Sequence, residues 1–193
     1  MSLRGLYAVT PEVPNLVAKV ASALEGGIAL LQYRRKKRDL HEAREIAALA
    51  RRHGVRLIVN DDVELALEIG ADGAHLGRGD GDLGAARKRL AGKLLGASCY
   101  NDLELAYRAV RAGADYVAFG SVFASPTKPS AVRAPLSLFG SDLNVPLCAI
   151  GGITLENAPQ VIVAGADLLA VVSDLFEAHD VKARAGEYRK LFA

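Results

Sequence analysis

A run of basic residues, Arg34–Arg38, follows the apolar segment Ile28–Tyr33. Such runs are usually solvated surface, but positive charge is unfavourable beside a helix N-terminus, and here an amphipathic helical pattern begins at Leu40. In an extended segment, Arg34 and Lys36 share one face. We therefore interpret this segment as a binding site for an anion such as phosphate.

Carboxylates follow the next two apolar segments of the chain. Asn60, Asp61 and Asp62 stand at the end of the first, and Asp80 follows the second. Mg²⁺ is typically held by one or two carboxylates together with substrate phosphate oxygens, so Asp61 and Asp80 predict a magnesium site facing the basic run. Asp62 suits a helix cap. Soft ligands are too few for zinc, and we expect His75 to be a packed core histidine.

Two later segments also suit anion contact. Gly151 and Gly152 follow the apolar segment Pro146–Ile150, where backbone N–H groups at a helix start could cradle phosphate, with Ser173 adding a hydroxyl; an ordinary turn is the alternative. The loop Ala124–Ala134 is long for a compact domain and predicts a lid, against a mobile surface loop. Two anion sites and one magnesium site predict two phosphorylated reactants, or a diphosphate and a monophosphate.

The elements that must position these residues alternate between two patterns. Amphipathic helical segments, such as Leu40–Arg52, Leu103–Ala112 and Ala178–Leu191, separate short and mostly continuous apolar runs of the kind found in buried parallel strands. These predicted strands are Gly5–Thr10, Ile28–Tyr33, Arg56–Asn60, Gly73–Leu76, Leu94–Ser98, Asp115–Gly120, Pro146–Ile150 and Asp167–Ser173. A Gly-Ala-Asp sequence recurs at 70–72, 113–115 and 165–167, where a helix should end and a strand begin.

This alternation predicts a compact (β/α)8 TIM barrel that forms a single domain over residues 1–193. The alternative, an open doubly wound sheet, predicts a glycine-rich turn after the first strand, and Pro11-Glu12-Val13-Pro14 stands there instead. Barrel active sites form at the C-terminal ends of the strands. The polar residues singled out above all follow predicted strands, so we expect them to meet at one mouth of the barrel.

The composition narrows the classes of partner. Hydrophobic residues make up 51% and charged residues 24%, and 24 basic residues balance 22 acidic ones. We therefore expect small-molecule substrates rather than nucleic acid or a membrane. The N-terminus lacks the layout of a signal peptide and the chain has two cysteines, which predicts a reduced, cytoplasmic protein. A homo-oligomer is possible.

Several segments together resemble the thiamine phosphate synthase (thiamine-phosphate pyrophosphorylase) family. The resemblance covers nearly the whole chain, in order and at compatible spacings. It is carried by Gln32–Lys36, Ile58–Leu67, Gly73–Asp80, Gly113–Gly120 with Ser125–Lys128, Ala149–Ile153 and Val171–Ser173. Two positions depart from the family pattern, since Arg35 stands where an acid is frequent and Gly79 replaces a common Glu.

The resemblance implies a reaction and a set of site residues. 4-Amino-2-methyl-5-hydroxymethylpyrimidine diphosphate would condense with hydroxyethylthiazole phosphate, or its carboxylate, to give thiamine phosphate and diphosphate through a pyrimidine-stabilised carbocation. Mg²⁺ would be held by Asp61 and Asp80. Substrate binding would fall to Gln32, Tyr33, Arg34, Arg35, Lys36, Asn60, Ser98, Ser125, Pro126, Thr127, Lys128, Gly152, Val172 and Ser173. Among these, the catalytic residues would be Arg34, Lys36, Ser98 and Lys128.

Three alternatives remain at this point. A thiazole tautomerase of the same superfamily should have lost Asp61 or Asp80 and should carry His where this chain has Ser121. A sugar-phosphate isomerase or epimerase barrel should present a Glu and His pair at the mouth. A barrel that binds phosphate ligands without catalysis should lack lid or metal residues.

Overall fold

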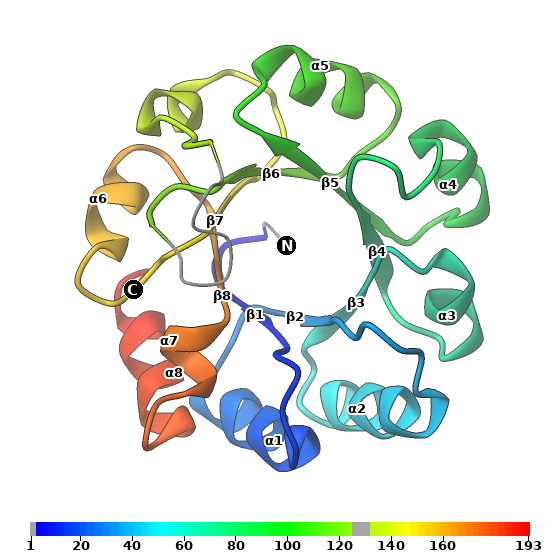
Figure 1. Ribbon diagram of the computed structural model, residues 1–193, viewed down its shortest axis with the longest axis vertical. Helices are drawn as coiled ribbons and strands as arrows, with labels where there is room; N and C mark the ends of the chain where they lie inside the picture. The colour runs from blue at the N-terminus through cyan, green and yellow to red at the C-terminus, as the bar shows by residue number, and fades with distance from the viewer. Residues whose placement is uncertain (1–2, 125–131) are drawn as a thin grey trace.

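The computed structural model describes residues 3–124 and 132–193 and confirms the predicted closed barrel. Eight parallel strands pair in chain order, and β8 closes on β1. The helices form a ring around them (Figure 1). The strands are β1 Gly5–Val9, β2 Leu30–Tyr33, β3 Arg56–Asn60, β4 Gly73–Leu76, β5 Leu94–Tyr100, β6 Tyr116–Gly120, β7 Leu147–Ile150 and β8 Leu168–Val171.

Most of the longer helices begin where the sequence provides an aspartate cap. The carboxylates of Asp39, Asp62, Asp82, Asp102 and Asp180 each accept a hydrogen bond from the backbone N–H three residues on. A 3-10 helix, η1 Leu136–Gly140, precedes β7. The α-helices are α1 Leu16–Gly26, α2 Leu40–Arg52, α3 Val63–Glu68, α4 Leu83–Arg89, α5 Leu103–Arg111, α6 Ala158–Val163, α7 Ser173–Phe176 and α8 Val181–Lys190. Within the described ranges, no helix has the length and apolar character needed to cross a membrane.

Several predicted boundaries were wrong, each for a local reason. Helix α8 begins at Val181 rather than Ala178, because Asp180 caps it. Strand β8 ends at Val171, because Ser173 already starts the short helix α7. Strand β5 runs past Ser98 to Tyr100 through an irregularity in its pairing with β6.

The recurring Gly-Ala-Asp sequence ties the N-terminal ends of neighbouring strands together. In each copy the aspartate N–H donates to a backbone carbonyl at the start of the preceding strand, and its carboxylate accepts from the N–H of that same residue. The aspartate–residue pairs are Asp72–Leu57, Asp115–Leu95 and Asp167–Leu147, with carboxylate distances of 2.8, 2.7 and 2.9 Å. These aspartates therefore stabilise the N-terminal end of the barrel. In this fold the active site forms at the opposite end, where the strands have their C-termini.

The molecule has two apolar cores, and successive residues of a strand contribute to them in turn. A large cluster joins the outward-facing strand residues to the helices, and a smaller one fills the barrel interior. In β1, Leu6 and Ala8 belong to the outer core, whereas Tyr7 and Val9 belong to the inner one. This alternation follows from the two-residue repeat of a strand. It also places the hydroxyl group of Tyr7 inside the barrel.

Candidate active site

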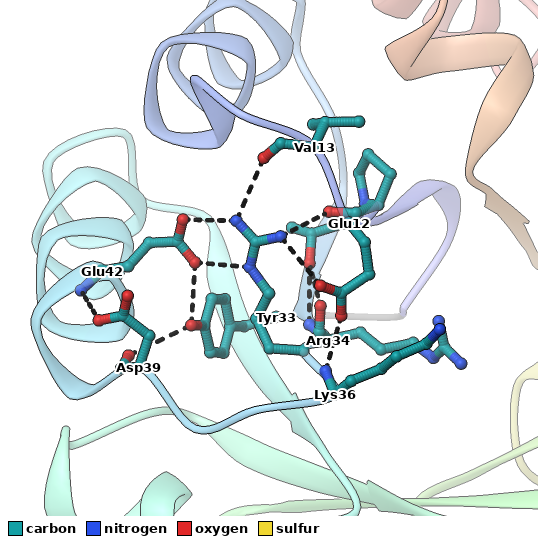
Figure 2. A network of polar contacts seen from close by, with 10 residues as sticks. Glu12, Val13, Tyr33, Arg34, Lys36, Asp39 and Glu42 are labelled. Atoms are coloured by element: carbon teal, nitrogen blue, oxygen red, sulfur yellow. Dashed lines mark hydrogen bonds and ion pairs between the residues drawn. The ribbon is translucent and has the colours of Figure 1, made fainter.

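The segment after β2 is fixed by its backbone and presents two basic side chains. The N–H of Arg34 donates to Oγ1 of Thr10 at 2.8 Å, and that hydroxyl donates to the Arg34 carbonyl at 3.1 Å. The N–H of Lys36 donates to Oε1 of Glu12 at 2.6 Å. Both side chains are exposed and extend to one side of the segment, away from Glu42 (Figure 2). This arrangement presents two positive charges at the mouth on a rigid support.

The side chains of Tyr33 and Arg35, also predicted to bind substrate, contact Glu42 and form part of that support. Nε and Nη2 of Arg35 donate to the two carboxylate oxygens of Glu42 at 2.7 and 2.6 Å, and Nη1 lies 3.3 Å from Glu12 (Figure 2). The Tyr33 hydroxyl donates to the same Glu42 carboxylate at 3.0 Å. The Arg35 guanidinium holds the pKa of Glu42 below its ordinary value. Alternation along the segment turns Arg35 away from Arg34 and Lys36.

Replacing Glu42 with glutamine is expected to lower the free energy of unfolding by about 2 kcal/mol, because a half-buried, bidentate charged contact is lost. The pKa of Glu42 is depressed in the folded state, so its contribution is present above pH 4.5 and disappears as the pH falls through that depressed value. Denaturant unfolding at several pH values should show the difference from wild type shrinking in acid. Glu45→Gln, an exposed change on the same helix, is the matched control; a difference independent of pH would contradict the ion-pair account.

Two carboxylates from neighbouring strands crowd together beside Arg34. Burial, followed by the nearby Asp80 carboxylate, raises the pKa of Asp61 to about 6, while the charge of Arg34 and a hydrogen bond from Asn60 act in the opposite direction. Asn60 Nδ2 donates to Asp61 Oδ2 at 2.6 Å, and the Gly77 N–H donates to Asp80 Oδ2 at 2.7 Å. Like charges held this close are relieved by a proton or a cation.

This pair of carboxylates fits Mg²⁺. Magnesium takes one or two carboxylates and completes its octahedron with water and phosphate oxygens. Among the described residues, His, Cys, Asp and Glu side chains form no cluster of three or more that could hold a metal alone. The donor set therefore suits a cation that arrives with a phosphorylated ligand.

The neighbouring residues Asp61 and Asp62 have different structural roles. Asp61 adopts a left-handed backbone with φ of 63°, and its N–H donates to the His75 carbonyl at 2.8 Å. Aspartate tolerates this conformation better than most residues. Asp62 instead caps α3, since its Oδ1 accepts from the Leu65 N–H at 2.7 Å. The prediction of Asp62 as a cap is confirmed.

A chain of hydrogen bonds crosses the barrel interior just below the mouth. His75 is buried, as predicted, but it is not an isolated core residue, because its Nε2 lies 2.9 Å from Ser98 Oγ. Its Nδ1 lies 3.0 Å from the hydroxyl of Tyr116, which contacts the Tyr7 hydroxyl at 2.8 Å. Gln32 Nε2 donates to Tyr7 at 2.7 Å. Burial lowers the pKa of His75 to about 4 and raises that of Tyr116 well above its ordinary value, so both groups are neutral near pH 7.

The two glycines after β7 are required by close packing against the loop after β6. Gly151 and Gly152 have φ values of 102° and 65°. A Cβ atom on Gly151 would lie 2.3 Å from Ser121 Oγ, and one on Gly152 would lie 2.3 Å from the Ala124 carbonyl oxygen. Asn157 fixes the turn by donating from Nδ2 to the Gly152 carbonyl at 2.9 Å. Helix α6 begins at Ala158, several residues after this turn, so the phosphate cradle stays a prediction for the turn itself.

Replacing Gly152 with alanine is expected to lower stability by about 1 kcal/mol or more, because it combines positive φ with a backbone collision. It should also weaken binding of a phosphate monoester by roughly tenfold or more, since the loop must shift. Thermal unfolding and calorimetric titration measure the two effects. Gly140→Ala, where a Cβ meets nothing within 4 Å, is the control; unchanged phosphate binding in Gly152→Ala would remove this turn from the cradle.

The structure brings most of the predicted site residues to the C-terminal ends of the strands. Arg34 and Lys36 follow β2, Asn60 ends β3 and Asp61 follows it, Asp80 follows β4, and Ser98 lies on β5. Gly152 follows β7, and Val172 and Ser173 follow β8. Ser125, Pro126, Thr127 and Lys128, predicted for the lid, lie outside the described residues. Sequence reasoning missed Tyr7 and Tyr116, whose only signal was a polar group on an inward-facing strand position.

Comparison with known proteins gives a consistent result over the whole chain. A family model described as thiamine monophosphate synthase matches residues 6–175. A thiamine-phosphate synthase of Aromatoleum aromaticum is 61% identical over 98% of this chain and 97% of its own length. That of an Azoarcus species is 54% identical over 99% and 98%.

Solved structures agree. A thiamine phosphate pyrophosphorylase from Pyrococcus furiosus superposes with a TM-score of 0.88 at 34% identity, over 98% of this chain and 96% of that one. A 3-hexulose-6-phosphate synthase from Salmonella typhimurium has a TM-score of 0.74 at 18% identity, over 97% of each chain. The second likeness reflects the barrel fold alone.

Proposed function

The chain belongs to the thiamine monophosphate synthase family, and from this premise we propose that it is a transferase that joins a pyrimidine diphosphate to a thiazole phosphate. The products are thiamine phosphate and diphosphate. The observation that carries the proposal is the meeting of Asp61 and Asp80 beside Arg34. A diphosphate leaving group needs such an arrangement of cation and basic residues.

The basic segment and the carboxylate pair would act on the leaving group. Arg34 and Lys36 bind the diphosphate and stabilise negative charge as the C–O bond to the pyrimidine methylene breaks, its electron pair leaving with the diphosphate. Asp61 and Asp80 would hold Mg²⁺, which when bound supplies further neutralisation of that charge. Asn60 orients Asp61 through its 2.6 Å hydrogen bond.

Capture of the resulting cation needs positioning rather than a protein nucleophile. The lone pair of the thiazole nitrogen forms the new C–N bond to the pyrimidine methylene. The cradle at Gly152, with Val172 and Ser173, would hold the thiazole phosphate so that the two rings meet. By family resemblance Lys128 would bind the diphosphate, and Ser125 and Thr127 would bind the thiazole phosphate; these residues lie outside the described ranges. Exclusion of water by this loop would protect the cation.

The competing functions fit the site less well. A thiazole tautomerase has no use for two carboxylates paired beside a basic segment, and Ser121 here donates to the Phe123 carbonyl at 2.7 Å. An isomerase would need an acid and base at the mouth, whereas His75 is neutral and bonded on both ring nitrogens.

We also propose a reducing, cytoplasmic location, which the two buried, unpaired cysteines suit.

The test is an end-point assay with purified protein, Mg²⁺, the pyrimidine diphosphate and the thiazole phosphate, with thiamine phosphate followed by chromatography. We expect product that disappears when EDTA is added and returns with excess Mg²⁺. Absence of product, with the thiazole phosphate still bound, would shift the assignment to the tautomerase or to a binding barrel. Product formation unaffected by EDTA would preserve the activity and remove the metal from it.

A further inference from the structure

Five side chains from five strands form one continuous hydrogen-bonded chain through the barrel interior. Its links are Gln32–Tyr7, Tyr7–Tyr116, Tyr116–His75 and His75–Ser98, at 2.7, 2.8, 3.0 and 2.9 Å. Its two ends, Gln32 and Ser98, are residues that family resemblance assigns to substrate binding. The middle three have no role in the chemistry derived above.

A glycine in β5 makes room for this series of hydrogen-bonded side chains. Gly96 lies next to the link between Tyr116 and His75, and a Cβ atom there would come within 2.3 Å of the Tyr116 hydroxyl and 2.5 Å of His75 Nδ1. Tyr7, Tyr116, His75 and Gln32 are all buried. A buried polar network of this kind must satisfy each of its members, and no buried side-chain nitrogen or oxygen in the described residues lacks a partner.

One direction along the links gives every buried hydroxyl hydrogen an acceptor. An amide nitrogen can only donate, so Tyr7 accepts from Gln32. The geometry of the Tyr7–Tyr116 contact allows either donor, but within the described residues Tyr116 is the acceptor within reach of the Tyr7 hydrogen, so a fully bonded network has Tyr7 donating to Tyr116. Tyr116 then donates its single hydrogen to His75 Nδ1, which must be the unprotonated nitrogen. His75 therefore carries its proton on Nε2 and donates to Ser98 Oγ. Ser98 Oγ then accepts from His75, so its own hydrogen is left to donate to a bound ligand.

We propose that Tyr7 and Tyr116 are positioning residues that fix the hydrogen-bond polarity of the pyrimidine pocket. They hold Gln32 with its amide oxygen as an acceptor and, through His75, hold Ser98 as a donor. A 4-aminopyrimidine offers the complementary pattern, an amino donor and ring-nitrogen acceptors. A 4-oxopyrimidine presents an acceptor where the amino group was, so the pocket selects against it. This proposal rests on the proposed function.

The first test needs no substrate. The ¹⁵N spectrum of labelled protein near pH 7, with His75 assigned by replacing the other histidines, reports which ring nitrogen carries the proton. We expect a protonated Nε2 and a bare Nδ1 in the wild type. In Tyr116→Phe the donor to Nδ1 is gone, and this preference should weaken. A proton on Nδ1 in the wild type would overturn the inferred direction.

The second test measures selectivity by binding. Unreactive phosphate monoesters of the 4-amino and 4-oxo pyrimidines are titrated calorimetrically into the wild type, Tyr7→Phe and Cys148→Ala. Without the Tyr7 hydroxyl the Gln32 amide can turn over, so the preference for the amino ring should fall about tenfold. Cys148 lies in the same interior cluster and takes no part in the chain, so its variant should keep the preference.

The outcomes separate this proposal from the proposed function. Equal loss of affinity for both rings in Tyr7→Phe would make the chain merely structural and overturn the proposal. Equal affinity for the two rings in the wild type would also overturn it. A wild type that selects the amino ring but makes no thiamine phosphate would instead contradict the proposed function.

Discussion

Asp61→Asn is expected to reduce Mg²⁺-dependent formation of thiamine phosphate by on the order of 10³-fold while the protein stays folded. Asparagine keeps the shape of the side chain and tolerates the left-handed backbone at this position, so the change removes chiefly the charge. Asp80 alone would bind the cation weakly. Initial rates across a Mg²⁺ titration, together with circular dichroism, measure both parts of this expectation.

The matched control for this change is the next residue. Asp62→Asn makes the same substitution one position along, but Asp62 caps α3 and asparagine caps a helix about as well as aspartate. This variant should keep both stability and turnover near the wild-type values. Equal loss of activity in the two variants, or full activity in Asp61→Asn, would remove Asp61 from the metal site.

Arg34→Met should lower kcat by about 100-fold, because a positive charge beside the departing diphosphate is lost and is used mainly in the transition state. The KM for the thiazole phosphate should change little, since its proposed site follows β7 and β8 whereas Arg34 follows β2. Stability should also be kept, because Arg34 is tied to Thr10 through its backbone. Single-turnover kinetics isolate the chemical step.

Arg38→Met tests whether removal of another arginine from this basic run lowers kcat as much as removal of Arg34. Arg38 pairs with Glu68 and lies 3.9 Å from Asp62, the residue that caps α3. Its variant should retain nearly full kcat. A fall in kcat of similar size in both variants would mean that the run acts through overall charge rather than through a contact made by Arg34.

Much of the barrel could be predicted because its signals are local. Continuous apolar runs, glycine helix ends and aspartate caps each depend on a few neighbouring residues, and helix α2 has the predicted bounds Leu40–Arg52. Polar residues that follow parallel strands must gather at one mouth, so Asp61 and Asp80 could be paired from the sequence even though they follow different strands.

What could not be predicted depends on partners far apart in the chain. Tyr7 and Tyr116 are separated by 109 positions, and each alone has the pattern of an ordinary core tyrosine. The ion pairs of Arg35 with Glu12 and Glu42 also join residues from separate segments, and the basic run alone does not indicate them. The donor and acceptor roles in a series of hydrogen bonds can be assigned only when all of its contacts are known. The sequence pattern does not show those contacts.

The central claim is that the Asp61 and Asp80 carboxylates hold a divalent cation together with a diphosphate. Crystals grown with Mn²⁺ in place of Mg²⁺ and with diphosphate would locate the metal by its anomalous scattering. We predict one peak in contact with both carboxylates and with diphosphate oxygens, and its loss in Asp61→Asn. A saturating peak elsewhere at the mouth, or diphosphate bound beside Arg34 and Lys36 without any metal on these aspartates, would contradict the account.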